Sequence, residues 1–257
     1  MPALPLFTRW VCIVPQTAIP YKNKILAAVP ADDFEKFFSD LHPVSLSLRQ
    51  QLHPSSSSPS YVYFIEEGVA SILVVMADGA AVEVGMIGTE GMVGVAALLG
   101  DDIADQQVIV QVPGTAQRLD ADLCRTAFNG SAALRTVALR FTAGLMALSA
   151  QTAACNQLHS VEQRFARWLL MAHHRLNTNL IPMTHEFLSS MLGVRRTGVT
   201  EIAARLRRSG LIHYRQGEIA ILNFDALRNT ACECYQLDHR RLLNLLTRPI
   251  LNFTIVR

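Results

Sequence analysis

Residues 183–209 read MTHEFLSSMLGVRRTGVTEIAARLRRS, and this stretch decides the fold of the C-terminal part of the chain. It predicts a short helix that Thr184 caps and Gly193 ends, followed at once by a second helix over residues 195–209. The second helix buries apolar residues at helical spacing, namely Val199, Ile202 and Leu206. Two short helices joined by a tight glycine-containing turn are typical of a helix-turn-helix.

A β-hairpin is predicted directly after the helix pair. Residues 211–222 read LIHYRQGEIAIL and alternate in polarity about Gln216-Gly217, which places Arg215 near the tip. A helix pair followed by a hairpin is the arrangement of a winged helix-turn-helix. The alternative interpretation is a small all-helical appendage.

The distribution of charge points to an anionic partner. Residues 160–257 hold 14 arginines and 7 acidic residues, whereas residues 1–159 hold 9 basic and 14 acidic residues, so a basic C-terminal third follows an acidic body. Phosphate contacts supply most non-specific affinity for nucleic acid, so this asymmetry favours DNA as a partner. The alternative is a solvated arginine-rich face.

The second helix of such a motif enters the major groove with its N-terminus first. Arginine bonds bidentately to guanine in that groove, and we expect Arg196 to read a base. The full set of predicted DNA contacts is Arg195, Arg196, Thr197, Thr200, Glu201 and Arg205, together with Thr184 and Arg215.

The N-terminal part changes in character between residues 61 and 112. Short β-branched or aromatic runs alternate with turn residues, and Asp78-Gly79 predicts a type I′ hairpin. Short helices are expected over residues 24–41, before these runs. The pattern predicts a β-sandwich or jelly roll.

A long helix follows, with apolar residues at heptad spacing. In one interpretation this helix pairs with the same helix of a second, twofold-related chain; in the other it is an ordinary core helix. The predicted dimer interface consists of Leu134, Phe141, Leu145, Leu148 and Thr152. Ser160-Val161-Glu162-Gln163 then matches a capping box and starts a new helix.

The expected fold class is α+β, with five segments along the chain. They are an N-terminal extension (1–22), a β jelly-roll sensor (23–130), a dimerisation helix (131–159), a winged helix-turn-helix (160–235) and a C-terminal tail (236–257).

Four stretches carry a resemblance to the Crp/Fnr family of bacterial regulators. They are VYFIEEG at residues 62–68, GTEGMVG at 88–94, NQLHSVEQR at 156–164 and MLGVRR at 191–196. The resemblance implies a cyclic-nucleotide-binding-like jelly roll, a long dimer helix and a winged helix-turn-helix. It also implies a homodimer on a palindromic operator, its recognition helices about one DNA turn apart, and RNA polymerase as a partner if the protein activates transcription.

The resemblance also assigns individual residues. Arg196 takes the position of the family's groove-reading arginine. Thr197 and Glu201 differ from the Glu and Arg that the family's cyclic AMP receptor protein has there, so the operator of that protein does not carry over.

The effector of the sensor domain is not identified by the sequence. Residues 50–117 contain no Lys or Arg, so cyclic AMP is not expected, because its phosphate would lack a cationic partner. An iron-sulfur cluster is not expected either, because only Cys12 lies near the N-terminus, and haem is likewise not expected. Backbone amides of the 88–94 loop could hold a small anion, or its glycines only shape a turn. Its candidate effector residues are Gly88, Glu90, Gly91, Met92 and Val93.

Five scattered cysteines favour reduced thiols in the cytoplasm. Cys232-x-Cys234 resembles half of a zinc site, and Cys155 and His159 could share a helix face, but no second clearly spaced pair is present and no metal is predicted. No nucleophile elbow, Walker loop or zinc-protease motif occurs, so we do not expect an enzyme. The longest apolar stretches, such as residues 69–76 and 91–100, are far shorter than a membrane span, so we do not expect a membrane protein. The alternative function is a small-molecule or protein-binding sensor module that does not bind DNA.

Overall fold

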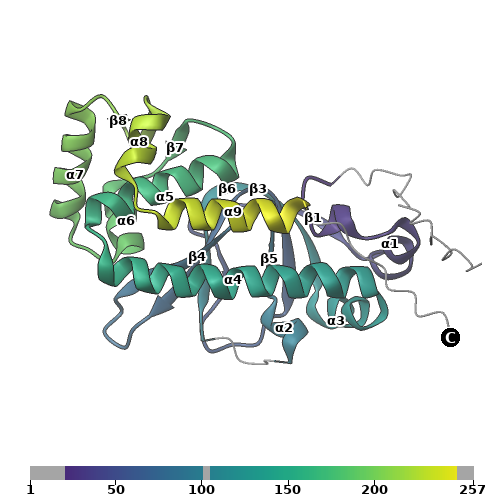
Figure 1. Cartoon of the computed structure of the whole chain (residues 1–257). Coiled ribbons are helices and arrows are strands. Elements are labelled where there is room, and N and C mark those ends of the chain that lie inside the picture. Colours follow the sequence, from purple (N-terminus) through teal and green to yellow (C-terminus); the bar gives the residue numbers. More distant parts are fainter. Residues whose placement is uncertain (1–20, 101–104, 248–257) are drawn as a thin grey trace, which may run out of the picture.

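The computed structural model describes residues 21–100 and 105–247. A β-sheet domain is covered by one long helix, and a winged helix-turn-helix lies at the far end of that helix (Figure 1). The predicted α+β architecture is therefore confirmed. Of the predicted N-terminal extension, residues 1–20 lie outside the described residues, as do residues 248–257 of the predicted tail.

The N-terminal domain is built on a six-stranded sheet with the order β1-β6-β3-β4, in which β2 pairs with β6 and β5 with β3. Its strands are β1 (His42–Leu46), β2 (Gln51–His53), β3 (Tyr61–Val75), β4 (Ala81–Ile87), β5 (Met92–Val93) and β6 (Gln107–Asp120). Two runs that the sequence suggests as separate strands form the single strand β3. The chain passes Gly68 at a φ of 87°, where the β3–β6 register shifts, so the glycine bends the strand without ending it.

The β3–β4 hairpin has a different turn from the predicted one. Gly79 has a φ of 83°, but Asp78 is not among the residues with positive φ, so the turn is not type I′. The Gly79 amide donates to the Met76 carbonyl and the Met76 amide to the Ala80 carbonyl. This three-residue loop needs positive φ at the glycine alone. The hairpin prediction is right, and its turn type is wrong.

Short helices surround the sheet, and one long helix spans it. They are η1 (Leu26–Ala28), α1 (Ala31–Phe37), α2 (Ala96–Leu99), α3 (Ala121–Gly130) and the 27-residue α4 (Ala132–Leu158). Ser131 caps α4, because its hydroxyl accepts from the Leu134 amide. The apolar face of α4 packs on the sheet through Leu134, Ala138 and Phe141.

The C-terminal domain contains both predicted helices and the predicted hairpin. Its elements are α5 (Val161–Leu176), β7 (Leu180–Pro182), α6 (His185–Leu192), α7 (Arg196–Arg208), β8 (Ile212–Arg215), β9 (Glu218–Ile221), α8 (Phe224–Thr230) and α9 (Cys234–Thr247). The predicted capping box is confirmed at the start of α5, where Ser160 and Gln163 bond reciprocally. A third strand, β7, pairs with β9; at three residues it is too short to give a sequence pattern.

The last helix is the main element that the sequence did not indicate. Residues 234–247, most of them in the expected tail, form α9, which lies antiparallel beside α4 (Figure 1). Arg167 of α5 donates two hydrogen bonds to Asp238 of α9, at 2.9 and 2.7 Å, and one to Thr152 of α4. These bonds hold α4, α5 and α9 together. No helix in the described ranges is long and apolar enough to cross a membrane.

A buried carboxyl joins the two domains. Glu83 of β4 accepts hydrogen bonds from Ser71 at 2.6 Å and from the indole of Trp168 on α5 at 3.0 Å. Burial raises the pKa of Glu83 from 4.5 to about 7.

This pKa predicts a pH-dependent stability. Between pH 4.5 and about 7 the folded chain keeps a proton that the unfolded chain has lost. The stabilisation is complete at pH values below the pKa that Glu83 has in the unfolded chain. It is lost as the pH rises towards the pKa in the folded chain, and the free energy of unfolding then falls by about 3 kcal/mol. We expect Glu83→Gln to flatten the pH dependence of the urea midpoint over this range. Glu35→Gln on the surface is the control, and parallel profiles for all three proteins would contradict the assignment.

Candidate DNA-binding surface and interdomain pocket

The helix-turn-helix is built by local caps and one buried face. The Thr184 hydroxyl accepts from the Phe187 amide at 3.2 Å, which starts α6 as predicted. Gly193 ends α6 in the left-handed region at a φ of 61°. The buried face of α7 consists of Val199, Ile202, Ala203 and Leu206. Because this face is held in the domain core, the opposite face of α7 points to solvent.

All of the predicted DNA contacts are exposed in the structure. They are Thr184, Arg195, Arg196, Thr197, Thr200, Glu201, Arg205 and Arg215. Arg195 and Arg196 stand at the N-terminal end of α7, and no carboxylate in the described part of the chain forms an ion pair with either. Their charge is therefore available to a ligand.

Two of the predicted contacts are engaged within the protein. The Arg205 guanidinium pairs with Glu162 of α5 at 2.9 Å. The Thr200 hydroxyl donates to the Arg196 carbonyl and lies 3.2 Å from Nδ1 of His185. These two side chains therefore help to hold α7 in its orientation, and they also remain polar groups on its exposed surface.

A stacked ring pair links the helix-turn-helix to the wing. The rings of His185 and Tyr214 lie 4.0 Å apart between centroids and 24° from parallel. Burial, followed by the charge of Arg196, lowers the pKa of His185, so this imidazole is neutral near pH 7. Sequence reasoning missed His185, Tyr214 and Glu162, because only the fold brings them to this surface.

The wing turn has the geometry that its sequence demands. Gln216 and Gly217 have φ values of 51° and 83°, and both central residues of a type I′ turn need positive φ. Arg215 pairs with Glu218 across the turn in the β8–β9 register, so the predicted position of Arg215 at the tip is confirmed.

The candidate effector loop packs against α4 and α5. Met92 and Val93 are buried, and a Cβ at Gly91 would lie 2.2 Å from the Phe141 ring of α4. Glu90 accepts a hydrogen bond from Arg175 of α5 at 2.8 Å, and both side chains are 6% exposed. Glu90 is thus paired with a cation of the other domain, and of the five candidate residues only Glu90 lines the pocket described next.

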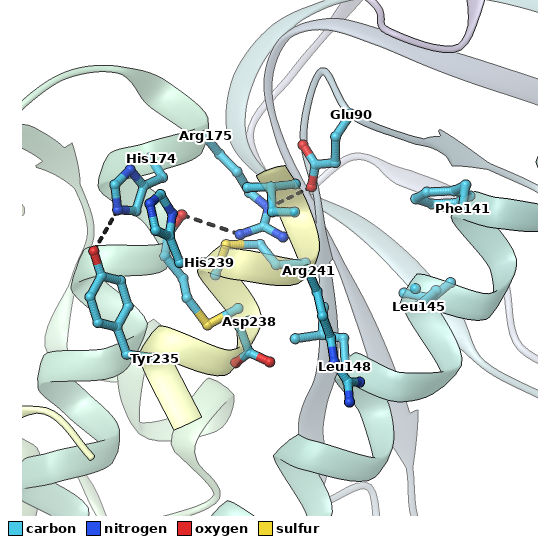
Figure 2. Close-up of a pocket in the computed structure, with 14 residues that line it drawn as sticks. Glu90, Phe141, Leu145, Leu148, His174, Arg175, Tyr235, Asp238, His239 and Arg241 are labelled. Atoms are coloured by element: carbon cyan, nitrogen blue, oxygen red, sulfur yellow. Dashed lines mark hydrogen bonds and ion pairs between the residues drawn. The ribbon is translucent and has the colours of Figure 1, made fainter. Parts of the chain in front are cut away.

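A pocket lies where the sheet domain, α4, α5 and α9 meet (Figure 2). Its volume is about 540 Å³, including the part open to solvent. Apolar side chains of α4, among them Phe141, Leu145 and Leu148, form one wall, and the Glu90–Arg175 pair lies at another. On the third side His174 bonds to the Tyr235 hydroxyl at 2.6 Å, and burial lowers the pKa of His174 to about 4.

The predicted dimer interface lies on the wrong face of α4. Leu134, Phe141 and Leu148 are buried in the core of their own chain, where a partner cannot contact them. Leu145 packs against this core, and Thr152 accepts a hydrogen bond from Arg167. Heptad spacing identifies an apolar face but not the surface that it covers, and here that surface is the chain's own sheet.

Four candidate metal ligands meet at the junction of α4 and α9. Sequence reasoning treated Cys155 with His159 and Cys232 with Cys234 as two unrelated pairs. The structure brings their ligand atoms within 4.8 Å of one another. The sequence has no second clearly spaced pair, but the fold brings Cys155 and His159 next to Cys232 and Cys234.

Residues 163–230 match the family described as the Crp-like helix-turn-helix domain. A comparison with curated protein sequences finds no match. Among solved structures, FixK2 from Bradyrhizobium japonicum superposes with a TM-score of 0.65 at 15% identity over 75% of this chain and 98% of its own.

Two further solved structures have the same fold. A transcriptional regulator of the Crp/Fnr family from Eubacterium rectale gives a TM-score of 0.61 at 14% identity, over 79% of this chain and 94% of its own. A CRP-family transcriptional regulator from Thermus thermophilus, TTHB099, gives a TM-score of 0.60 at 20% identity, over 73% of this chain and 96% of its own.

The family match and the exposed second helix identify a DNA-binding helix-turn-helix domain in the C-terminal part of the chain. Residues 163–230 are a Crp-like helix-turn-helix domain, and the chain shares the fold of the solved Crp/Fnr-family structures. A sensor module that does not bind DNA would leave the domain match without an explanation.

Proposed function

We propose that the protein binds a palindromic operator in the cytoplasm as a homodimer, with one α7 helix of each chain in successive major grooves. The observation that carries this proposal is an exposed stripe along α4, on the side away from the sheet. Its residues follow four- and three-residue steps: Leu139, Ala143, Met146, Ala150, Ala153 and Gln157. Leu139 and Met146 are 46% and 69% exposed. Such spacing is that of a two-stranded helical seam.

The residues of this stripe suit pairing with a second copy of the same helix. Ala143, Ala150 and Ala153 are small, which lets two helices approach closely, while Leu139 and Met146 supply apolar bulk at intervals of seven residues. Twofold pairing through this stripe leaves α7 of each chain free to contact DNA, because the stripe and the exposed face of α7 belong to separate elements (Figure 1).

Within this dimer, Arg196 reads a guanine, and Arg195 and Thr197 contact the backbone or neighbouring bases. The first turn of α7 presents backbone amides and a partial positive charge to a phosphate. Thr184 and Arg215 flank this helix on α6 and the wing and contact the adjacent phosphates. Glu201 accepts from cytosine on the same groove-facing side.

The signal acts at the pocket between the domains. A small molecule bound there touches α4, α5 and α9 at once, so it can favour one relative position of the two domains over another. The two binding events are thermodynamically linked. The factor by which the ligand changes the protein's affinity for the operator equals the factor by which the operator changes the protein's affinity for the ligand. If the protein activates transcription, RNA polymerase is its further partner.

Placing a charge in the stripe tests the dimer. Met146→Arg puts two guanidinium groups together at the twofold axis, and we expect the dimer to weaken by at least about 30-fold. Sedimentation of the full chain measures the dissociation, and binding to an operator selected from a random DNA pool measures the loss of affinity. Leu123→Arg, which charges an exposed leucine on α3, is the control. A Met146→Arg protein that remains dimeric would refute the proposed interface.

A further inference from the structure

Three cysteines and a histidine form a compact cluster at the junction of the two domains. Cys155 lies in the last turn of α4, and His159 directly follows that helix. Cys234 is the first residue of α9, and Cys232 lies two residues before it. All three thiols are buried, with at most 4% exposure, and all are free rather than joined in disulfides.

The spacing of the ligand atoms agrees with a single tetrahedral ion. Zinc bonds of about 2.3 Å to sulfur and 2.0–2.1 Å to nitrogen place two sulfurs about 3.8 Å apart, and a sulfur and a nitrogen about 3.6 Å apart. The sulfurs of Cys155 and Cys232 lie 3.5 Å apart, and Cys234 sulfur lies 3.6 Å from Nδ1 of His159. All four atoms fall within 4.8 Å of one another, so small side-chain movements close the tetrahedron.

The surrounding groups complete the pattern of a metal site. Nε2 of His159 lies 3.3 Å from a carboxylate oxygen of Glu233, which holds the imidazole with Nδ1 directed at the cluster. The side-chain amide of Gln151 donates to Cys234 sulfur at 3.0 Å, and hydrogen bonds of this kind stabilise a metal-bound thiolate.

Two buried arginines supply positive charge beside the sulfurs. Three thiolates around a divalent cation leave a net charge of about −1. Arg164 and Arg167 both lie within electrostatic range of Cys155 and Cys232. Nε of Arg164 is buried and, within the described residues, has no hydrogen-bond partner. A negatively charged metal cluster gives this cation a counter-charge.

We propose that Cys155, His159, Cys232 and Cys234 bind one zinc ion. Three sulfurs and one imidazole nitrogen in a closed tetrahedral set are typical of structural zinc, because soft thiolates favour this ion and no position is left open for catalysis. Binding releases the three thiol protons to solvent, and His159 binds in its neutral form. The ion ties the end of α4 to the start of α9 and so stabilises the position of the DNA-binding domain on the long helix.

The metal content of the purified full chain tests the site directly. We expect one zinc per chain by elemental analysis, and a tetrahedral thiolate spectrum when cobalt(II) replaces zinc. Cys234→Ser is expected to lose both. Cys124→Ala, which changes a buried cysteine in the core of the sheet domain, is the matched control and is expected to keep both. Wild-type protein that holds less than about a tenth of an equivalent and gives no cobalt spectrum would overturn the proposal.

A milder variant separates metal binding from folding. Glu233 is 72% exposed and is not a ligand, so Glu233→Gln leaves the fold intact. Loss of this outer partner is expected to weaken zinc affinity about 10- to 100-fold, measured by competition with a chelator. Glu35→Gln is the control. An unchanged affinity for Glu233→Gln, or a titration that finds two thiols oxidised to a disulfide in the metal-free protein, would count against the site.

Discussion

Replacing Arg196 by alanine is expected to weaken operator binding by at least about 30-fold. A bidentate arginine–guanine contact contributes about 1–3 kcal/mol, and a dimer loses two of them. Arg196 is exposed at the first position of α7 with no internal ion pair in the described chain, so its loss leaves the domain core unchanged. Fluorescence anisotropy with an operator selected from a random pool measures the effect.

The pattern of loss distinguishes base reading from simple charge. Arg196→Ala is expected to relax the preference at one operator position, whereas Arg215→Ala on the wing weakens all sequences alike and lowers the salt dependence. Lys36→Ala, on the distant α1, controls for the loss of a positive charge. If Arg196→Ala keeps wild-type affinity and preference, Arg196 does not read the operator.

Removing the Asp238 carboxylate is expected to destabilise the folded protein by about 3–5 kcal/mol. Asp238 and Arg167 are a buried ion pair, with side chains 4% and 7% exposed, and Asp238→Ala removes the carboxylate to which the guanidinium is hydrogen-bonded. Burial raises the pKa of Asp238 and Arg167 lowers it, so the two groups depend on each other for the charged state. Urea denaturation measures the loss of folding stability, and hydrogen exchange of the α9 amides shows whether that helix is the part affected.

The control is an ion pair of the same kind on the surface. Asp225 pairs with Arg228 at 3.0 Å on α8, and the Asp225 side chain is 76% exposed. Asp225→Ala is expected to change stability by less than about 1 kcal/mol. Equal effects of the two substitutions would mean that the Arg167–Asp238 pair does not hold α9 in place.

The elements that the sequence predicts best are those with local signals. Thr184, Gly193 and the Gln216-Gly217 turn act on their immediate neighbours in the chain, so their residue types alone indicate where α6, α7 and the wing begin and end. The capping box at Ser160 belongs to the same group. Local rules of this kind do not depend on where the rest of the protein lies.

The features that the sequence did not predict depend on tertiary packing. Both faces of α4 have apolar residues at heptad spacing, and only the position of the sheet decides that Phe141 is buried while Met146 is exposed. Likewise, 77 positions separate Cys155 from Cys232, and no short motif links them. The pairing of Glu90 with Arg175 is of the same kind, since 85 positions separate them.

The length of α4 has a geometrical consequence for the choice of DNA site. With 27 residues and a rise of 1.5 Å each, the helix is about 40 Å long and reaches from the sheet domain to the helix-turn-helix. Tilting a rod of that length by about 5° at one end displaces the other by roughly 3.5 Å, close to the 3.4 Å that separates stacked base pairs. A tilt of α4 too small to disturb the packing around a ligand would thus shift the two recognition helices by about one base pair along the DNA.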